Sequence, residues 1–171
     1  FLAEEAPHGH MAIGTTVFPT GIGMAATWSP TLIEEVGNVI AKEIRSQGAH
    51  ISYGPVLDLS RDPRWSRVEE TFGEDPVLSG RLGAAMILGL GSGDLSCEYA
   101  TIATLKHFLA YAVPEGGQNG NYASVGTRDL HENFLPPFRE AIDAGALSVM
   151  TSYNSIDGVP CTANHYLLTQ L

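Results

Sequence analysis

The sequence predicts an α/β fold built on a parallel β-sheet. Its 171 residues contain four short apolar runs rich in β-branched residues, separated by three segments with helical hydrophobic periodicity. The runs do not alternate between apolar and polar residues, which is typical of strands buried on both faces of a parallel sheet. An eight-stranded α/β barrel typically needs about 250 residues. We therefore expect a (β/α)8 TIM-barrel-like fold of which this chain holds about half, so that residues 1–171 form a fragment of one barrel domain.

The four expected strands lie at residues 16–18, 51–57, 101–106 and 147–152. In parallel α/β folds, ligands bind beyond the carboxyl ends of the strands. Polar clusters follow three of the expected strands, at residues 58–67, 106–107 and 153–154. This placement predicts a functional site at that end of the sheet.

The first two helices are delimited by capping residues. Ser29-Pro30 begins the first helix and Gly48 ends it, while Asp75-Pro76 begins the second and the glycines from Gly89 end it. The apolar positions of the first helix recur at helical spacing: Leu32, Ile33, Val36, Val39, Ile40 and Ile44. Those of the second are Leu78, Leu82, Ala85 and Met86.

The third helical pattern begins near Arg128 and ends at Gly145. Pro136-Pro137 lies inside it, and proline removes a helical hydrogen bond and clashes with the preceding turn. The sequence therefore predicts two short helices in succession.

Composition excludes several classes of partner. The formal net charge is -10 at pH 7, which argues against nucleic acid and anionic membrane surfaces. Cys97 and Cys161 alone cannot form a disulfide framework or a metal cluster, and the six histidines show no metal-ligand spacing on a helix. No phosphate-binding glycine motif follows a strand. We expect no metal and no cofactor.

The chain contains no apolar run of the ~20 residues that cross a membrane. It opens at Phe1 without a signal peptide and stops at Leu171 inside an apolar helical pattern, so both ends look cut. The cellular compartment therefore stays open.

Residues 61–67 (Arg-Asp-Pro-Arg-Trp-Ser-Arg) form the most informative segment. They lie in a strand-to-helix loop, where rigid scaffolds carry their chemistry. Arginine supplies a planar fork of donors and tryptophan a flat apolar face, and sugar recognition uses both. A solvated charged loop is the alternative, and for Trp65 packing is a simpler role than that of a sugar platform.

Lys106-His107-Phe108 ends the third expected strand. Lysine donates hydrogen bonds to hydroxyls, and histidine donates or accepts them. Adjacent side chains on a regular strand point to opposite faces, so the backbone must depart from regular geometry to aim both into one site. A strand end that simply enters solvent is the alternative.

Taken together, these motifs resemble glycoside hydrolase family 3, the β-glucosidase-type enzymes. The resemblance covers nearly the whole chain and rests on strings in the expected order: residues 5–9, 17–19, 54–58, 61–67, 72–76, 106–108, 135–138 and 149–154. It implies the N-terminal barrel domain of a β-glucosidase that hydrolyses terminal non-reducing β-D-glucosyl residues with retention. The partner it implies is a small carbohydrate substrate, a β-glucoside or a β-xyloside.

The resemblance also implies which residues bind the sugar: Glu5, Arg67, Lys106, His107 and Tyr153. Glu70 could support Arg67 or be a plain surface residue. The family tends to hold the peptide bonds around its Lys-His pair in cis form. By the same resemblance, the nucleophilic Asp and the acid/base residue lie beyond Leu171, so we expect no catalytic residue in this chain. The fragment would be inactive without the remainder of its barrel and a C-terminal domain.

Two other functions stay open. The first is a β-xylosidase of the same family, because Glu5 is longer than the Asp that many β-glucosidases carry there and could crowd a hexose's hydroxymethyl group. The second is a non-catalytic carbohydrate-binding relative. Exported bacterial enzymes are common among such β-glucosidases, an association that favours a periplasmic or secreted protein.

Overall fold

The computed structural model describes residues 1–171 and contains a parallel four-stranded sheet in the order β1-β2-β3-β4. The strands are β1 (Ala3–Glu5), β2 (Ile51–Tyr53), β3 (Ile102–Phe108) and β4 (Ser148–Thr151). Ala3 pairs with Ile51 and Ile51 with Ile102 in parallel register. β1 and β4 each pair on one side only, so the sheet has two open edges.

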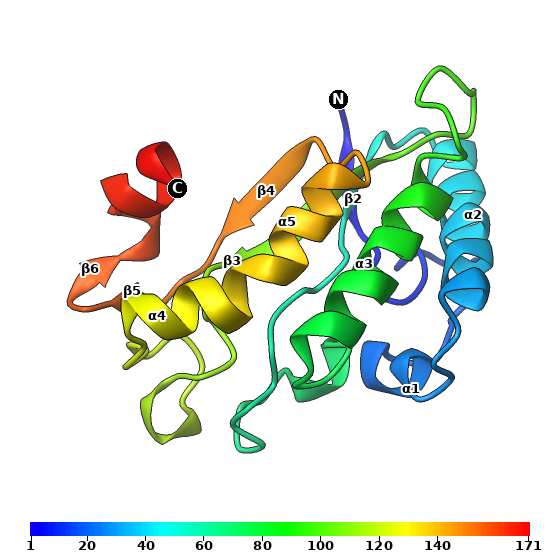
Figure 1. Cartoon of the computed structure of the whole chain (residues 1–171). Coiled ribbons are helices and arrows are strands. Elements are labelled where there is room, and N and C mark those ends of the chain that lie inside the picture. Colours follow the sequence, from blue (N-terminus) through cyan, green and yellow to red (C-terminus); the bar gives the residue numbers. More distant parts are fainter.

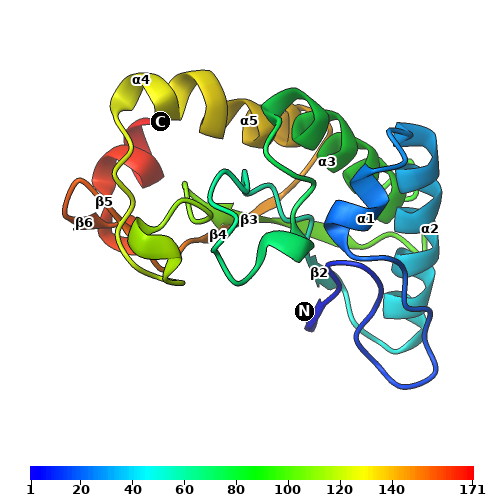
Figure 2. The same ribbon diagram turned by 90° about the horizontal axis from the view of Figure 1, so that it is seen from below.

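Three long helical elements cover one face of the sheet (Figures 1 and 2). They are α2 (Pro30–Ser46), α3 (Pro76–Leu90) and α5 (Leu135–Asp143), and α3 packs between the other two. Sequential parallel strands with all crossover helices on one face form the singly wound pattern of an α/β barrel, whereas doubly wound folds carry helices on both faces. The TIM-barrel-like fold class is therefore confirmed, as an open part of a barrel.

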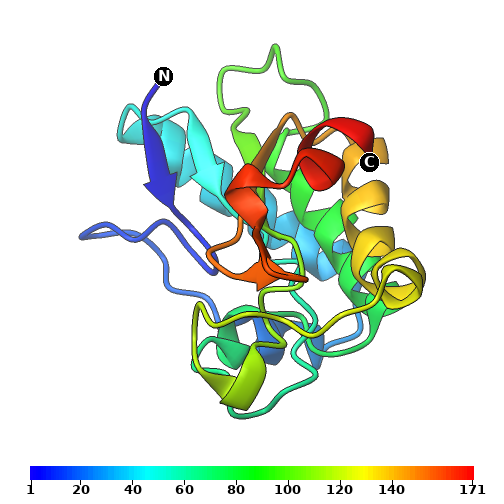
Figure 3. The same ribbon diagram turned by 90° about the vertical axis from the view of Figure 1, so that its left-hand side faces the viewer.

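The remaining elements are short. They are α1 (Gly21–Ala25), α4 (Thr127–Asp129), the 3₁₀ turns Val68–Glu70, Glu115–Gly117 and Cys161–Ala163, the π-helical turns Leu130–Phe134 and Tyr166–Gln170, and the hairpin of β5 (Ser155–Ile156) with β6 (Val159–Pro160). Figure 3 views the molecule from the side of this C-terminal hairpin and turn, which lie next to β4. No helix of the chain has the length and apolar character that a bilayer crossing requires.

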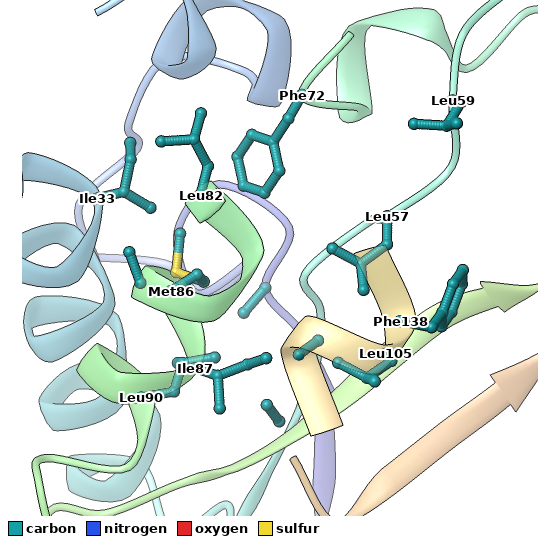
Figure 4. Packing of buried hydrophobic residues seen from close by; sticks show 14 of the residues in the cluster. Ile33, Leu57, Leu59, Phe72, Leu82, Met86, Ile87, Leu90, Leu105 and Phe138 are labelled. Atoms are coloured by element: carbon teal, nitrogen blue, oxygen red, sulfur yellow. The ribbon is translucent and has the colours of Figure 1, made fainter. Parts of the chain in front are cut away.

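One apolar core lies between the helices and the sheet (Figure 4). Ile33 of α2 and Leu82 and Met86 of α3 are almost completely buried, as are Leu105 of β3 and Leu57, which follows β2. Burial of side chains of this size contributes about 1.5–3 kcal/mol each. The core thereby fixes the strands whose carboxyl ends carry the polar residues.

The predicted starts of the first two helices are confirmed. Ser29 caps α2 by accepting a hydrogen bond from the backbone N–H of Leu32 at 3.3 Å. Asp75 caps α3 by accepting from Val77 and Leu78, each at 2.8 Å. In both helices proline follows the cap, where its missing N–H needs no partner.

The prediction of a first strand at residues 16–18 is wrong. This segment lies in the loop between β1 and α1, where the Glu43 carboxylate accepts a hydrogen bond from the backbone N–H of Thr16 at 3.0 Å. The first strand is β1 instead, whose sequence Ala-Glu-Glu lacks the β-branched residues that signal a strand. An edge strand with two exposed glutamates has no apolar pattern to read.

The chain does not break at Pro136-Pro137, and the two short helices predicted there form one helical run whose hydrogen-bond register changes just before the prolines. The chain stays helical from Thr127 through the π-helical turn Leu130–Phe134 into α5. In that turn the Leu135 N–H donates to the Leu130 carbonyl, and the two prolines then occupy the first turn of α5, where their missing N–H groups cost nothing.

Candidate functional site

Polar side chains from three strands meet at the carboxyl end of the sheet. Glu5 is the last residue of β1, and Lys106 and His107 stand near the end of β3. Lys106 Nζ donates a hydrogen bond to Glu5 Oε2 at 2.7 Å, although 101 positions separate the two residues in sequence. The Lys106 side chain is 2% exposed and that of Glu5 is 55% exposed, so Glu5 carries the pair to the surface.

His107 is held by Asp58, which follows β2. Asp58 Oδ2 accepts from the backbone N–H of His107 at 3.1 Å and lies 2.7 Å from His107 Nδ1. Both side chains are buried. The structure thus places Asp58 against the histidine ring and its backbone.

The peptide bonds Lys106–His107 and Phe108–Leu109 are cis, as the resemblance implies. The register of β3 against β4 shifts between Leu105 and Phe108. Lys106 and His107 both form ion pairs or hydrogen bonds with carboxylates at this end of the sheet, Lys106 with Glu5 and His107 with Asp58. The alternative of a strand end that enters solvent is excluded, because both side chains are buried.

Arg67 is held by Glu70, its neighbour in the same loop. Arg67 Nε and Nη2 donate to the two Glu70 carboxylate oxygens at 2.6 and 2.8 Å. These hydrogen bonds raise the pKa of the Arg67 guanidinium above its ordinary value, against the opposing effect of burial. Glu70 therefore supports Arg67, as one of the two sequence interpretations held.

Burial is the largest single influence on the Glu70 carboxyl and favours its neutral form. The hydrogen bonds and charge of Arg67, with a smaller contribution from the positive charge of Lys106, outweigh burial and lower the pKa of Glu70. Glu70 is therefore ionised at neutral pH and balances the positive charge of the site.

Tyr111 is the aromatic centre of the site, and sequence reasoning missed it. Its ring is completely buried and meets three other rings edge to face, with centroid distances of 5.2 Å to Trp65, 4.7 Å to His107 and 5.8 Å to Tyr153. The Arg67 guanidinium lies over the Tyr111 ring, 5.6 Å from its centroid. The available signal was its position just after β3, where the site lies. Tyr111 thus contacts three of the five predicted residues.

Trp65 packs inside the site and has no exposed face for a ligand. It is 2% exposed, and its indole N–H donates to Asn119 Oδ1 at 2.9 Å. Tyr153, in contrast, is 75% exposed and lies beside Gly120 of the loop that follows Tyr111. A ligand can therefore reach the Tyr153 ring but not that of Trp65.

All five predicted residues come together at one end of the sheet. Glu5 and Lys106 form one pair, His107 is adjacent to Lys106, and Arg67 and Tyr153 contact the Tyr111 ring that also packs on His107. No group of three or more His, Cys, Asp or Glu side chains gathers as metal ligands would. The arrangement offers hydroxyl-binding donors and acceptors beside one exposed aromatic ring, which suits a neutral polyhydroxyl ligand.

A singly wound parallel sheet with such a site at its carboxyl end defines a TIM-barrel-like domain. The sequence matches the family model of the glycosyl hydrolase family 3 N-terminal domain over residues 1–171. The chain belongs to glycosyl hydrolase family 3.

Relatives and solved structures agree with this assignment. The chain is 34% identical to a periplasmic beta-glucosidase of Salmonella typhimurium over 98% of its length and 41% identical to a beta-xylosidase of Formosa agariphila over 98%. A crystal structure of a mutant beta-glucosidase from Listeria innocua in complex with laminaribiose matches 96% of the chain, with a TM-score of 0.91 and 39% identity. The chain spans 21%, 24% and 23% of the length of these three proteins. It is thus similar to one domain of larger glycoside hydrolases.

Proposed function

We propose that the full-length protein hydrolyses terminal non-reducing β-D-glucosyl residues by a retaining mechanism, and that Glu5, Arg67, Lys106, His107 and Tyr153 bind the terminal sugar. The observation that carries this proposal is the Lys106–Glu5 pair, in which a buried ammonium and a half-exposed carboxylate meet beside His107. Charged groups fixed by partners form short, directional hydrogen bonds to neutral hydroxyls.

The catalytic carboxylates of this reaction come from outside residues 1–171 in our proposal. Retaining hydrolysis needs a nucleophile and an acid about 5 Å apart. The three carboxylates at the site are each engaged, Glu5 with Lys106, Asp58 with His107 and Glu70 with Arg67. We infer that residues 1–171 are part of the catalytic barrel domain and supply its sugar subsite.

A β-xylosidase is the second candidate, and Glu5 is the residue that favours it. A glutamate at this position reaches further into the subsite than an aspartate and reduces the room for a hydroxymethyl group, which xylose lacks. The 41% identity to the beta-xylosidase of Formosa agariphila supports the same function. A sugar-binding protein without catalysis is the third candidate.

Release of nitrophenol from aryl β-D-glucoside and aryl β-D-xyloside by the full-length protein distinguishes the three. Faster hydrolysis of the glucoside supports a β-glucosidase, and faster hydrolysis of the xyloside supports a β-xylosidase. If neither is hydrolysed but glucose or xylose binds in calorimetry, the non-catalytic function is correct.

Replacement of Glu5 by aspartate tests its part in this choice. Shortening the side chain makes room for the hydroxymethyl group, so Glu5→Asp should raise the ratio of glucoside to xyloside kcat/KM about tenfold, the effect of a one-carbon change in a binding pocket. Glu4→Asp is the matched control, because the adjacent side chain of β1 points to the opposite face. An unchanged ratio in Glu5→Asp would remove Glu5 from the specificity argument.

A further inference from the structure

Asp58 is the only carboxylate among the buried residues of the chain. Its Oδ2 atom accepts the backbone N–H of His107 at 3.1 Å and meets His107 Nδ1 at 2.7 Å, and the two side chains are 1% and 4% exposed. Its Oδ1 atom is buried and has no partner. Burial of a carboxylate costs free energy unless its oxygens are hydrogen-bonded, and one oxygen of Asp58 is not. Packing alone therefore does not explain why an aspartate occupies this position.

The contact dictates where the proton of the His107 ring lies. Asp58 Oδ2 already accepts the backbone N–H of His107, so the same oxygen acts as the acceptor for the ring, and Nδ1 carries the hydrogen that it donates. A neutral imidazole protonated at Nδ1 keeps its lone pair on Nε2. The Nε2 atom has no hydrogen-bond partner within the chain and is not among its fully covered polar atoms, so a ligand can reach it.

We propose that Asp58 is a positioning residue that fixes the His107 ring and its tautomer, so that Nε2 faces the bound sugar as a hydrogen-bond acceptor for one hydroxyl. This inference rests on the proposed sugar-binding function. Because Asp58 binds both the backbone and the ring of His107, it prevents two changes. A flip of the ring would present a carbon atom to the ligand in place of Nε2, and a change of tautomer would present an N–H donor in place of the Nε2 lone pair. Tyr111 also packs edge to face with the His107 ring, with 4.7 Å between the centroids, and so restrains it further.

Substitution of Asp58 in the full-length protein tests the kinetic consequence. Asp58→Asn should lower kcat/KM for the aryl glycoside that the protein prefers by 10- to 100-fold. Asp94→Asn should leave it unchanged, because Asp94 is an exposed aspartate after α3 whose side chain bonds its near neighbour Ser96. Monodeoxy forms of the same aryl glycoside sharpen the test. On the one form that lacks the hydroxyl bound by Nε2, Asp58→Asn and wild type should differ less than about threefold.

A double-mutant cycle separates positioning from a general structural role. His107→Asn keeps an amide donor for Asp58 but removes Nε2, so adding Asp58→Asn to it should lower kcat/KM by no more than about twofold. Two results would overturn the proposal by showing that Asp58 only stabilises the fold. In the first, the kcat/KM losses of Asp58→Asn and His107→Asn multiply in the double variant. In the second, Asp58→Asn loses the same factor in kcat/KM on every monodeoxy substrate.

The tautomer is also measurable without any substrate. In full-length protein labelled with ¹⁵N-histidine, the ring resonances assigned by their loss in His107→Asn should show Nδ1 protonated and Nε2 bare at neutral pH. A bare Nδ1 would overturn the inference even in an active enzyme, and a doubly protonated ring would contradict the acceptor role of Nε2. If no glycoside is hydrolysed but Nδ1 alone carries the proton, the geometry of the pair holds and the proposed function is what fails.

Discussion

At the scale of single residues, the site is a set of pairs in which one member supports the other. Glu70 orients Arg67 through two hydrogen bonds, Asp58 orients His107, and Glu5 pairs with Lys106. A long cationic side chain otherwise loses considerable conformational entropy when it binds a hydroxyl. Pairing fixes the cation beforehand, so that the ligand does not have to order it.

The Arg67–Glu70 pair makes a pH-dependent contribution to stability. Because folding lowers the pKa of Glu70, this contribution is complete above the carboxyl's unfolded pKa of about 4.3 and is lost as the pH falls through the lower folded value. Glu70→Gln should therefore destabilise the full-length protein by about 1–2 kcal/mol at pH 7, with a smaller difference at pH 3.5. Melting temperatures of the variant and wild type at both pH values measure it.

Glu132→Gln is the control for this prediction. Glu132 forms an exposed ion pair with Arg128 at 3.3 Å, in which both side chains are more than half exposed. Exposed pairs of this kind contribute little, so the control should melt close to wild type at both pH values. A Glu70→Gln protein whose deficit stays constant or grows in acid would contradict the pKa direction.

Tyr111 supports the binding residues mainly with its ring, because its buried hydroxyl has no partner at hydrogen-bond geometry and makes only a minor contribution to the raised pKa of Arg67. Tyr111→Phe should change kcat/KM for the preferred aryl glycoside less than about threefold. Tyr111→Leu removes the flat surface under Arg67, His107 and Tyr153 and should lower kcat/KM about tenfold or more, since each aromatic contact contributes about 0.5–1.5 kcal/mol. Equal losses in both variants would assign the role to the hydroxyl.

The residues that could bind a ligand were predictable from the sequence, but the contacts among them were not. Lys106 and His107 were recognisable because charged residues at a buried strand end need an explanation, and Arg67 because of its motif. Asp58 and Tyr111 were not assigned their roles, since a contact such as Asp58–His107 joins residues 49 positions apart through the parallel pairing of neighbouring strands. No local pattern encodes that distance.

At the scale of elements, α2 and α3 approach each other through glycine. A Cβ atom added to Gly37 would lie 2.8 Å from the Met86 carbonyl oxygen, and one added to Gly89 would lie 2.9 Å from Gly37 Cα. Both values are below the separation that carbon and backbone atoms tolerate, and the obstructing atoms belong to rigid helix backbone. The glycines therefore set the spacing of the helices behind the sheet.

Gly89→Ala tests this contact. Alanine has the higher helix propensity by about 1 kcal/mol, but overpacking against α2 costs about 1–3 kcal/mol or more, so the net change should be destabilising. The melting temperature of the full-length protein should fall below that of Gly126→Ala, a position where an added Cβ meets nothing within 4 Å. A variant at or above wild type would show that the helices can separate freely.

Elements with local signals were predictable, and those defined by tertiary pairing were not. α2 and α3 have a cap, a following proline and an apolar stripe within one segment, so both starts were predicted. β1 is a strand only because β2 lies beside it, and Pro136-Pro137 is tolerated only because the preceding turn is π-helical. The strand β1 depends on its neighbour β2, and the helix at Pro136-Pro137 depends on a change of hydrogen-bond register. The conformational preferences of single residues encode neither.

At the scale of the whole molecule, the sheet and its helices leave surfaces that a closed barrel would cover. β1 and β4 have free edges, and an apolar hollow of about 770 Å³ lies between α5 and the C-terminal turn. Its lining includes Phe108, Leu135, Val149 and Leu168. If further strands paired with these edges to close a barrel, the polar site at the carboxyl end of the sheet would form one side of a larger site.

Residues 1–171 alone should therefore show no glycoside hydrolysis above the uncatalysed rate. In our proposal both catalytic carboxylates lie outside residues 1–171, and the three carboxylates at the site each support a cation or an imidazole instead. Nitrophenol release by the isolated chain, compared with an equal concentration of the full-length protein, measures this, with circular dichroism to establish whether the isolated chain is folded.

The same question can be answered in the full-length protein if the isolated chain does not fold. Glu5→Gln, Asp58→Asn and Glu70→Gln each weaken one hydrogen-bonded support, so each should lower kcat by no more than about 100-fold. Loss of a covalent nucleophile lowers kcat on the order of a million-fold. A loss of that size in any one of the three, with a melting temperature close to wild type, would place the nucleophile inside this chain. Three modest losses would instead show that none of the three is the nucleophile, in agreement with a nucleophile from outside residues 1–171.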